Sequence, residues 1–157
     1  MNIIEYKVIK DENRHPILMN AHKYKWDESF EDYGKIVRMM NQCFNMNKLN
    51  EEYGYIVAFD YNLNILGVYE VCHGSSSGMN VNNKEIYTFL LLVGAEQFVL
   101  LHNHPSGNLQ ISNDDYNFTS SVNAFSALIN INLIESIVIA GDGYSLILKS
   151  QIDKLRG

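Results

Sequence analysis

The sequence predicts a single layered domain of the α/β (α+β) class, in which helices flank a mixed central β-sheet. Apolar runs rich in strand formers come in pairs, at residues 53–61 with 64–73 and at 134–140 with 144–148. Segments with apolar residues three and four positions apart separate these pairs, which is the spacing of a helix. Paired strands that alternate with helices are typical of a sheet covered by helical layers.

The length is that of one domain, because 157 residues can bury a sizeable core but are too few for two ordinary domains. Apolar residues make up 46% and charged residues 19%, as in soluble globular proteins. We therefore expect one domain over residues 1–157. Within it, residues 1–27 should form an N-terminal strand and loop, and residues 28–150 the core.

The first half of the chain predicts an alternation of strand, loop, helix and hairpin. Residues 3–9 alternate enough to form a strand, and residues 11–25 are polar, as in a loop or a hairpin excursion. Helical spacing begins at Glu28 and extends to Phe44. The strands at 53–61 and 64–73 then flank a turn-rich stretch, so an antiparallel hairpin is expected.

The second half predicts two helices and three strands. Residues 84–94 indicate a largely buried helix, residues 97–101 a short buried strand, and residues 113–129 a long helix. The last strand pair flanks Asp142-Gly143, a two-residue hairpin signal. Residues 151–157 form a short terminal segment of no evident chemistry.

The charge and the two cysteines exclude several functions. Net charge is −6, from 12 Lys+Arg and 18 Asp+Glu, without a basic cluster, which argues against nucleic-acid binding through phosphates. Cys43 and Cys72 form no C-x-x-C pair, so we expect free thiols in a reducing cytoplasm. The N-terminus lacks the features of a signal peptide, and the most apolar region, residues 87–101, is too short for a membrane span.

A histidine motif follows the strand at 97–101 and predicts a metal site. His102 and His104 are two residues apart, and such side chains point to the same face of a strand. Ser112 is a good N-cap, which places Asp115 at the third position of the next helix. Two imidazoles and one carboxylate give three ligands with room for a water, which is the form of a catalytic zinc site.

A purely structural interpretation of the same residues exists. Ser112 and Asp115 also fit a variant of the capping box, and the helix macrodipole favours an aspartate in the first turn without any metal. A single histidine at a strand end is usually structural. Two histidines at this spacing, with a serine and a carboxylate at fixed offsets, favour the metal.

The pattern H-x-H, seven residues, S-x-x-D resembles the motif of the JAMM (JAB/MPN) metalloproteases, and His-Asn-His-Pro-Ser-Gly is similar to its form in the RadC-like branch. The resemblance covers about residues 30 to 150. It implies a JAB/MPN-like (cytidine-deaminase-like) fold, zinc held by His102, His104 and Asp115, and a role for Ser112 in stabilising the oxyanion.

The same resemblance implies a catalytic glutamate on an upstream strand, a place that Glu70 matches. By strand parity, Glu70 shares a face with the apolar residues Leu66, Val68 and Cys72. A carboxylate on an apolar face must be paired, hydrogen-bonded or functional, because burying it alone is costly. The alternative is that Glu70 lies on a solvent face.

The chain departs from the family at two places and carries a polar loop. It has Asn83-Lys84-Glu85 where the family commonly has Pro-Arg-Glu, and Glu135-Ser136 where the family has Asp-His. None of these is an expected zinc ligand, so only substrate contacts should differ. Residues 73–83 are small and polar, and form either a wall of the substrate cleft or an ordinary connection.

The expected function is hydrolysis of a peptide or isopeptide bond in a peptide or protein substrate, with Zn²⁺ activating water and Glu70 as general base. H-E-x-x-H and the deaminase signature H-x-E with P-C-x-x-C are absent, which excludes those two zinc-enzyme classes. Two alternatives remain open: a DNA-repair-associated RadC-like module, against which the acidic charge counts, and a non-catalytic domain that binds metal or peptide.

Overall fold

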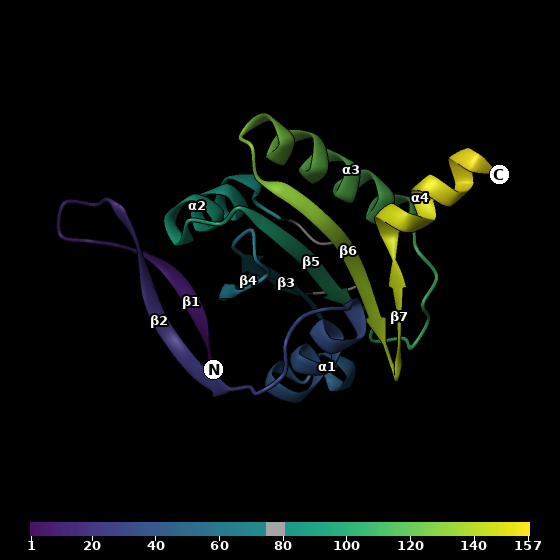
Figure 1. Ribbon diagram of the computed structural model, residues 1–157, viewed down its shortest axis with the longest axis horizontal. Coiled ribbons are helices and arrows are strands. Elements are labelled where there is room, and N and C mark those ends of the chain that lie inside the picture. Colours follow the sequence, from purple (N-terminus) through teal and green to yellow (C-terminus); the bar gives the residue numbers. More distant parts are fainter. Residues whose placement is uncertain (75–80) are drawn as a thin grey trace.

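The computed structural model describes residues 1–74 and 81–157 and contains a seven-stranded mixed sheet with helices on both faces (Figure 1). The strand order is β2-β1-β4-β3-β5-β6-β7. The strands are β1 (Asn2–Lys10), β2 (Pro16–Lys25), β3 (Glu52–Phe59), β4 (Ile65–Gly74), β5 (Gln97–Asn103), β6 (Asn132–Ala140) and β7 (Gly143–Leu146). The helices are α1 (Tyr33–Phe44), the short 3-10 helix η1 (Met46–Lys48), α2 (Asn83–Val93), α3 (Asn113–Leu128) and α4 (Ile147–Arg156). This confirms the predicted fold class.

The N-terminal residues form a long hairpin at one edge of the sheet. β1 and β2 pair antiparallel from Asn2↔Lys25 to Lys10↔Pro16, and Figure 1 shows this hairpin reaching away from the helices. The Asp11 carboxylate accepts hydrogen bonds from the backbone N–H groups of Asn13 and His15 and so closes the turn. The hairpin alternative for residues 11–25 was therefore right, and the loop alternative was wrong.

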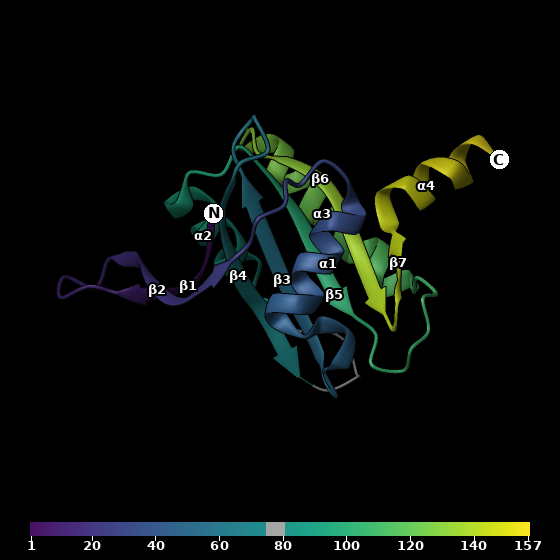
Figure 2. The same ribbon diagram turned by 60° about the horizontal axis from the view of Figure 1, so that its bottom comes forward.

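Two hydrophobic cores lie on opposite faces of the sheet, and Figure 2 shows α1 in front of it with α3 behind. Successive residues of a strand point to opposite faces, so each strand supplies both cores. On β5, Val99 and Leu101 pack with α1, whereas Phe98 and Leu100 pack with α2 and α3. On β3, the odd-numbered residues from Tyr55 to Phe59 belong to the α1 core. This alternation decides which face each polar residue at a strand end occupies.

The C-terminal segment is helical, unlike the expectation. β7 ends at Leu146 and α4 begins at once, so the predicted strand over 144–148 is two residues too long. The reason is Glu135, whose side chain accepts hydrogen bonds from the N–H groups of Leu148 at 2.6 Å and Lys149 at 3.1 Å. These are N–H groups of the first helical turn, which have no partner within a helix. Their acceptor is distant in sequence, so local pattern could not reveal it.

Among the helices that the structure describes, none is long and apolar enough to cross a membrane. Cys43 and Cys72 are both free, as expected.

Candidate metal centre

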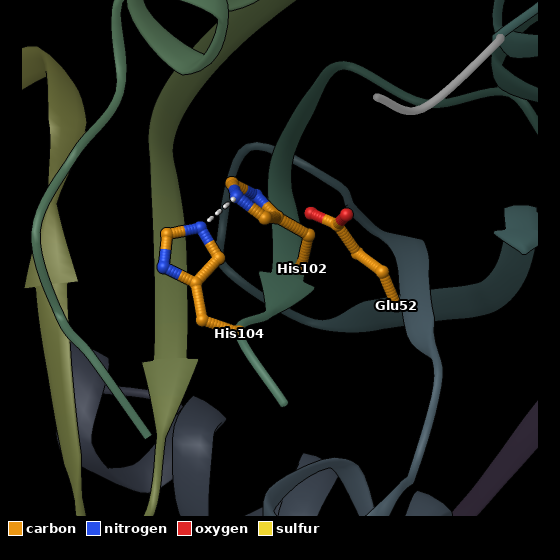
Figure 3. Close-up of side chains that lie close together, drawn as sticks. All are labelled: Glu52, His102 and His104. Atoms are coloured by element: carbon orange, nitrogen blue, oxygen red, sulfur yellow. Dashed lines mark hydrogen bonds between the residues drawn. The ribbon is translucent and has the colours of Figure 1, made fainter. Parts of the chain in front are cut away.

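The two histidines of the motif leave the end of β5 toward the face covered by α2 and α3. His102 continues the series of Phe98 and Leu100 and is 4% exposed. The His104 N–H donates to the carbonyl oxygen of Ile139 at 2.8 Å, which draws the chain toward β6. The two Nε2 atoms lie 3.2 Å apart. Figure 3 shows the two rings turned toward each other, with a dashed line between them. The expected convergence of these side chains is therefore present.

Asp115 joins them from the first turn of α3. Its Oδ1 lies 3.1 Å from Nε2 of His102, and its Oδ2 lies 3.3 Å from Nε2 of His104. Zinc bonds of about 2.0–2.1 Å in a tetrahedron separate neighbouring ligand atoms by about 3.3–3.4 Å. The observed separations involve both oxygens of the carboxylate and are close to this value, so the spacing of the three side chains suits one metal ion.

A capping box fixes Asp115. The Ser112 hydroxyl accepts the Asp115 N–H at 3.1 Å, and Oδ2 of Asp115 accepts the Ser112 N–H at 2.9 Å. The structural interpretation of this pair is thus correct, and it is compatible with metal binding because the carboxylate also faces both histidines. Ser112 is exposed, and its part in stabilising an oxyanion stays a prediction.

Hydrogen bonding orients the His104 ring for metal binding. Nδ1 lies 2.8 Å from the carbonyl oxygen of Asn108 and, as the only possible donor of that pair, carries the proton. The neutral ring then has its lone pair on Nε2, the nitrogen that faces His102 and Asp115. Ligating histidines commonly donate their second N–H in this way.

The electrostatics of the cluster also suit a cation. Burial by itself would raise the pKa of the Asp115 carboxyl. Without a metal, hydrogen bonds from His102 and from the protonated ring of His104, the charge of His102 and the Ser112 N–H together hold that pKa well below its ordinary value. The hydrogen bond to Asp115 raises the pKa of His104, against the opposing effect of burial. The Asp115 carboxylate is therefore ionised at neutral pH.

Glu52, the first residue of β3, was not among the predicted site residues. One of its carboxylate oxygens lies within 4.8 Å of a ring nitrogen of each histidine, and Figure 3 shows it reaching toward them from the neighbouring strand. Glu52, His102 and His104 form a cluster able to hold a metal ion. The sequence pattern began this strand at residue 53, one residue too late, although Glu52 shares the parity of Ile56 and Ala58, which face α2.

Glu70 lies on the opposite face, contrary to the geometry expected from the sequence. The ladder pairs Tyr55 with Glu70 but Gly54 with Cys72, so Val71 is an extra residue, a β-bulge. Cross-strand partners point to the same face, and Tyr55 belongs to the α1 core. Glu70 therefore points to the α1 face, where its Oε2 lies 3.7 Å from Nδ1 of His73. The structure does not bring it to the histidines of the motif.

His73 stacks on Tyr53 with ring centroids 5.0 Å apart and takes part in the Glu70 pair. Of the polar loop considered as a cleft wall, residues 75–80 lie outside the residues that the structure describes.

Comparison with known sequences gives this geometry a context. The family model of RadC-like JAB domains matches residues 30–152, which is most of the chain. The match includes Asp115 together with Glu52, His102 and His104. The chain belongs to the RadC-like JAB domain family. The resemblance drawn from the histidine motif is thereby confirmed.

Relatives of this RadC-like domain include three UPF0758 proteins. The one from Clostridium acetobutylicum is 32% identical over 106 residues, which is 68% of this chain and 46% of the relative. The one from Clostridium beijerinckii is 25% identical over 150 residues, or 91% of this chain and 66% of the relative. The one from Thermotoga maritima is 22% identical over 108 residues, or 69% of this chain and 49% of the relative. The match thus spans about half to two thirds of each relative.

Proposed function

We propose that this domain is a zinc-dependent hydrolase that cleaves a peptide or isopeptide bond in a peptide or protein substrate. One observation carries the proposal: ligand atoms of His102, His104 and Asp115 converge at 3.1–3.3 Å, with a fourth polar side chain, Glu52, beside them. Membership in the JAB domain family supports the same reaction class.

The three ligands would leave a coordination position open. Zinc bound by them would lower the pKa of a water molecule to about 7 and polarise the carbonyl of the scissile bond. Two imidazoles with one carboxylate are a ligand set found at catalytic zinc sites. The side chains of His102 and Asp115 are only 5% and 11% exposed, so the surroundings strengthen the charge interactions on which such catalysis depends.

The geometry favours Glu52 over Glu70 as general base. The Glu52 carboxylate lies within 4.8 Å of the histidine nitrogens, which is close enough to hydrogen-bond a water bound between them. It would take a proton from that water and return it to the leaving amine. The exposed Ser112 hydroxyl would donate to the oxyanion, because its capping bond uses only a lone pair of the oxygen.

The decisive experiment compares two isosteric variants, Glu52→Gln and Glu70→Gln. Each should bind zinc like the wild type, measured by elemental analysis, because neither removes one of the three proposed ligands. Turnover should fall about 10²–10⁴-fold in Glu52→Gln, since an amide accepts no proton, and stay at the wild-type rate in Glu70→Gln. The substrates are a panel of fluorogenic peptides and lysine-linked isopeptides.

The opposite result, with loss only in Glu70→Gln, would return the base role to Glu70. Full activity in both variants would refute a glutamate base. Zinc binding without turnover across the panel would favour the non-catalytic alternative, and tight, salt-dependent DNA binding would favour a DNA-linked module.

A further inference from the structure

The strands that carry Glu52 and the histidines separate at the site. β3 and β5 pair antiparallel from Phe59↔Gln97 as far as Gly54↔His102. Beyond this point β5 still bonds to β6, through the N–H of His104 and Ile139, but has no further ladder partner on β3. On its other side, Glu52 is the last partner of β4, paired with Gly74. The backbone at Glu52 is therefore held by ladder pairing on one side only.

The side chain of Asn103 bridges this opening. It lies between the two histidines in sequence and is only 2% exposed. Its Oδ1 accepts the N–H of Tyr53 at 2.6 Å, and its Nδ2 donates to the carbonyl oxygen of Glu51 at 2.9 Å. One carboxamide thus binds the peptide groups on both sides of Glu52 and replaces the bonds that a longer β5 would have supplied.

We propose that Asn103 is a positioning residue, whose carboxamide holds the Glu52 carboxylate at its working distance from the metal centre. The inference rests on the proposed role of Glu52. Asn103 acts through the backbone, because neighbours on a strand point to opposite faces and its side chain is thus directed away from the face of His102. Asn103 lies between the two histidines in sequence and also binds the backbone on both sides of Glu52. The segment 102–104 therefore positions both the proposed histidine ligands and the proposed base.

The chemistry of the bridge requires a donor and an acceptor on a short side chain. Aspartate at this position could still accept from Tyr53 but could not donate to Glu51, and leucine could do neither. Asn103→Asp leaves one partly buried backbone group without this partner and Asn103→Leu leaves two, which favours movement of the segment that carries them. Asn103→Asp therefore removes one hydrogen bond of the bridge, and Asn103→Leu removes both.

The test uses Co²⁺ as a spectroscopic probe on the full chain, with no substrate. The proteins are wild type, Asn103→Asp, Asn103→Leu, Glu52→Gln and the double variant Asn103→Leu/Glu52→Gln. For each, the pH midpoint of the visible cobalt spectrum is recorded, together with amide exchange at Tyr53 by NMR. Every protein should bind one cobalt ion, because the three proposed ligands are unchanged.

The midpoint in Glu52→Gln should fall by about one pH unit, since a negative charge close to the metal centre is removed. Asn103→Leu should shift in the same direction. The carboxylate in Asn103→Asp adds a negative charge of its own, which raises the midpoint, so this variant is compared with the wild type by amide exchange at Tyr53. The double variant should match Glu52→Gln alone, because two changes that act through one group are not additive. Exchange at Tyr53 should quicken in Asn103→Leu and stay slow in Asn103→Asp.

Glu135→Gln is the control for a general loss of stability. The change removes the charge of a buried carboxylate that accepts hydrogen bonds from N–H groups in the first turn of α4. It should lower the melting temperature without moving the pH midpoint of the cobalt spectrum. A wild-type midpoint in Asn103→Leu, with a shifted Glu52→Gln, would show that Asn103 is only structural and would overturn the inference alone. An unshifted midpoint in Glu52→Gln, or no cobalt uptake by wild type, would overturn the proposed function and the inference with it.

Discussion

Two groups of carboxylates and histidines lie on opposite faces of the same sheet, and they differ in burial and convergence. On the α1 face, Glu70 and His73 form a single pair at 3.7 Å, with side chains 39% and 53% exposed. On the other face, Asp115 contacts both His102 and His104 at 3.1–3.3 Å, and the three side chains are 5–17% exposed. Solvent screens the charges of an exposed pair, so their attraction contributes little to stability. Buried charges are costly unless opposite charges and hydrogen bonds compensate them, as they do in the set of three.

The comparison teaches that residue type and strand parity do not by themselves locate a site. Glu70 has the residue type and the strand position of a catalytic glutamate, but it shares the face of Val68 and pairs with Tyr55, and both of these belong to the α1 core. The bulge that follows at Val71 leaves Cys72 opposite Gly54, which in turn pairs with His102 on its other side. The register of the two strands and the bulge together thus decide which side chains of β4 lie on the face of the histidines.

The largest expected effect is on metal binding. His102→Ala should lower zinc affinity by on the order of 10² or more, because it removes a ligand and not merely an outer partner. The matched variant His73→Ala should keep zinc, because His73 lies on the other face. Elemental analysis after dialysis against a weak chelator measures both. Zinc retained in His102→Ala, or lost in His73→Ala, would break the distinction between the two faces.

The next effect is on the reactivity of Cys72. Burial, followed by the charges of Glu52 and Glu70, raises the pKa of its thiol to about 11. Only the thiolate reacts, so alkylation by iodoacetamide at pH 8 should be about a hundredfold slower than for an unhindered cysteine. The rate should rise about tenfold per pH unit until pH 11 is approached. Mass spectrometry of the labelled peptide gives the rate.

The two glutamates can be separated by the same alkylation assay. Glu52→Gln should accelerate labelling of Cys72 more than Glu70→Gln does, because Glu52 is the stronger of the two charges that raise its pKa. A larger acceleration in Glu70→Gln would mean that Cys72 faces α1 with Glu70, and the assignment of faces at the bulge would be wrong.

A smaller effect is expected for the cap of α3. Ser112→Ala should lower the free energy of unfolding of the metal-free protein by about 1 kcal/mol, because the Asp115 N–H loses its acceptor. Ser112→Asn should restore most of this stability, since asparagine caps helices well. Urea unfolding followed by circular dichroism measures both variants. Equal losses in the two would show that the serine hydroxyl has a role beyond the cap.

The smallest effect is expected for the exposed pair. His73→Ala and Glu70→Gln should each change the free energy of unfolding by less than about 0.5 kcal/mol, because solvent screens a pair at this exposure. The same urea measurement applies. A decrease in the free energy of unfolding above about 1.5 kcal/mol in Glu70→Gln would contradict this expectation. It would mean that the Glu70 carboxylate makes a contact important for the fold.

Local sequence alone predicted much of the fold and three of the four cluster residues. His102 and His104 are two residues apart on a strand, and Asp115 occupies the third position of a helix that begins after Ser112. These relations depend on strand and helix periods and on capping, which act over a few residues. The alternation of strands and helices was readable for the same reason.

Only the tertiary structure decided between Glu52 and Glu70. Both are glutamates on neighbouring strands, and which one faces the histidines depends on the register in which β3 pairs with β4 and with β5. The connection of Glu135 to α4 and of Asn103 to the segment around Glu52 is equally non-local. Register and bulges arise from pairing between distant segments, and a shift by one residue turns every side chain to the other face, so strand periodicity could not reveal the choice.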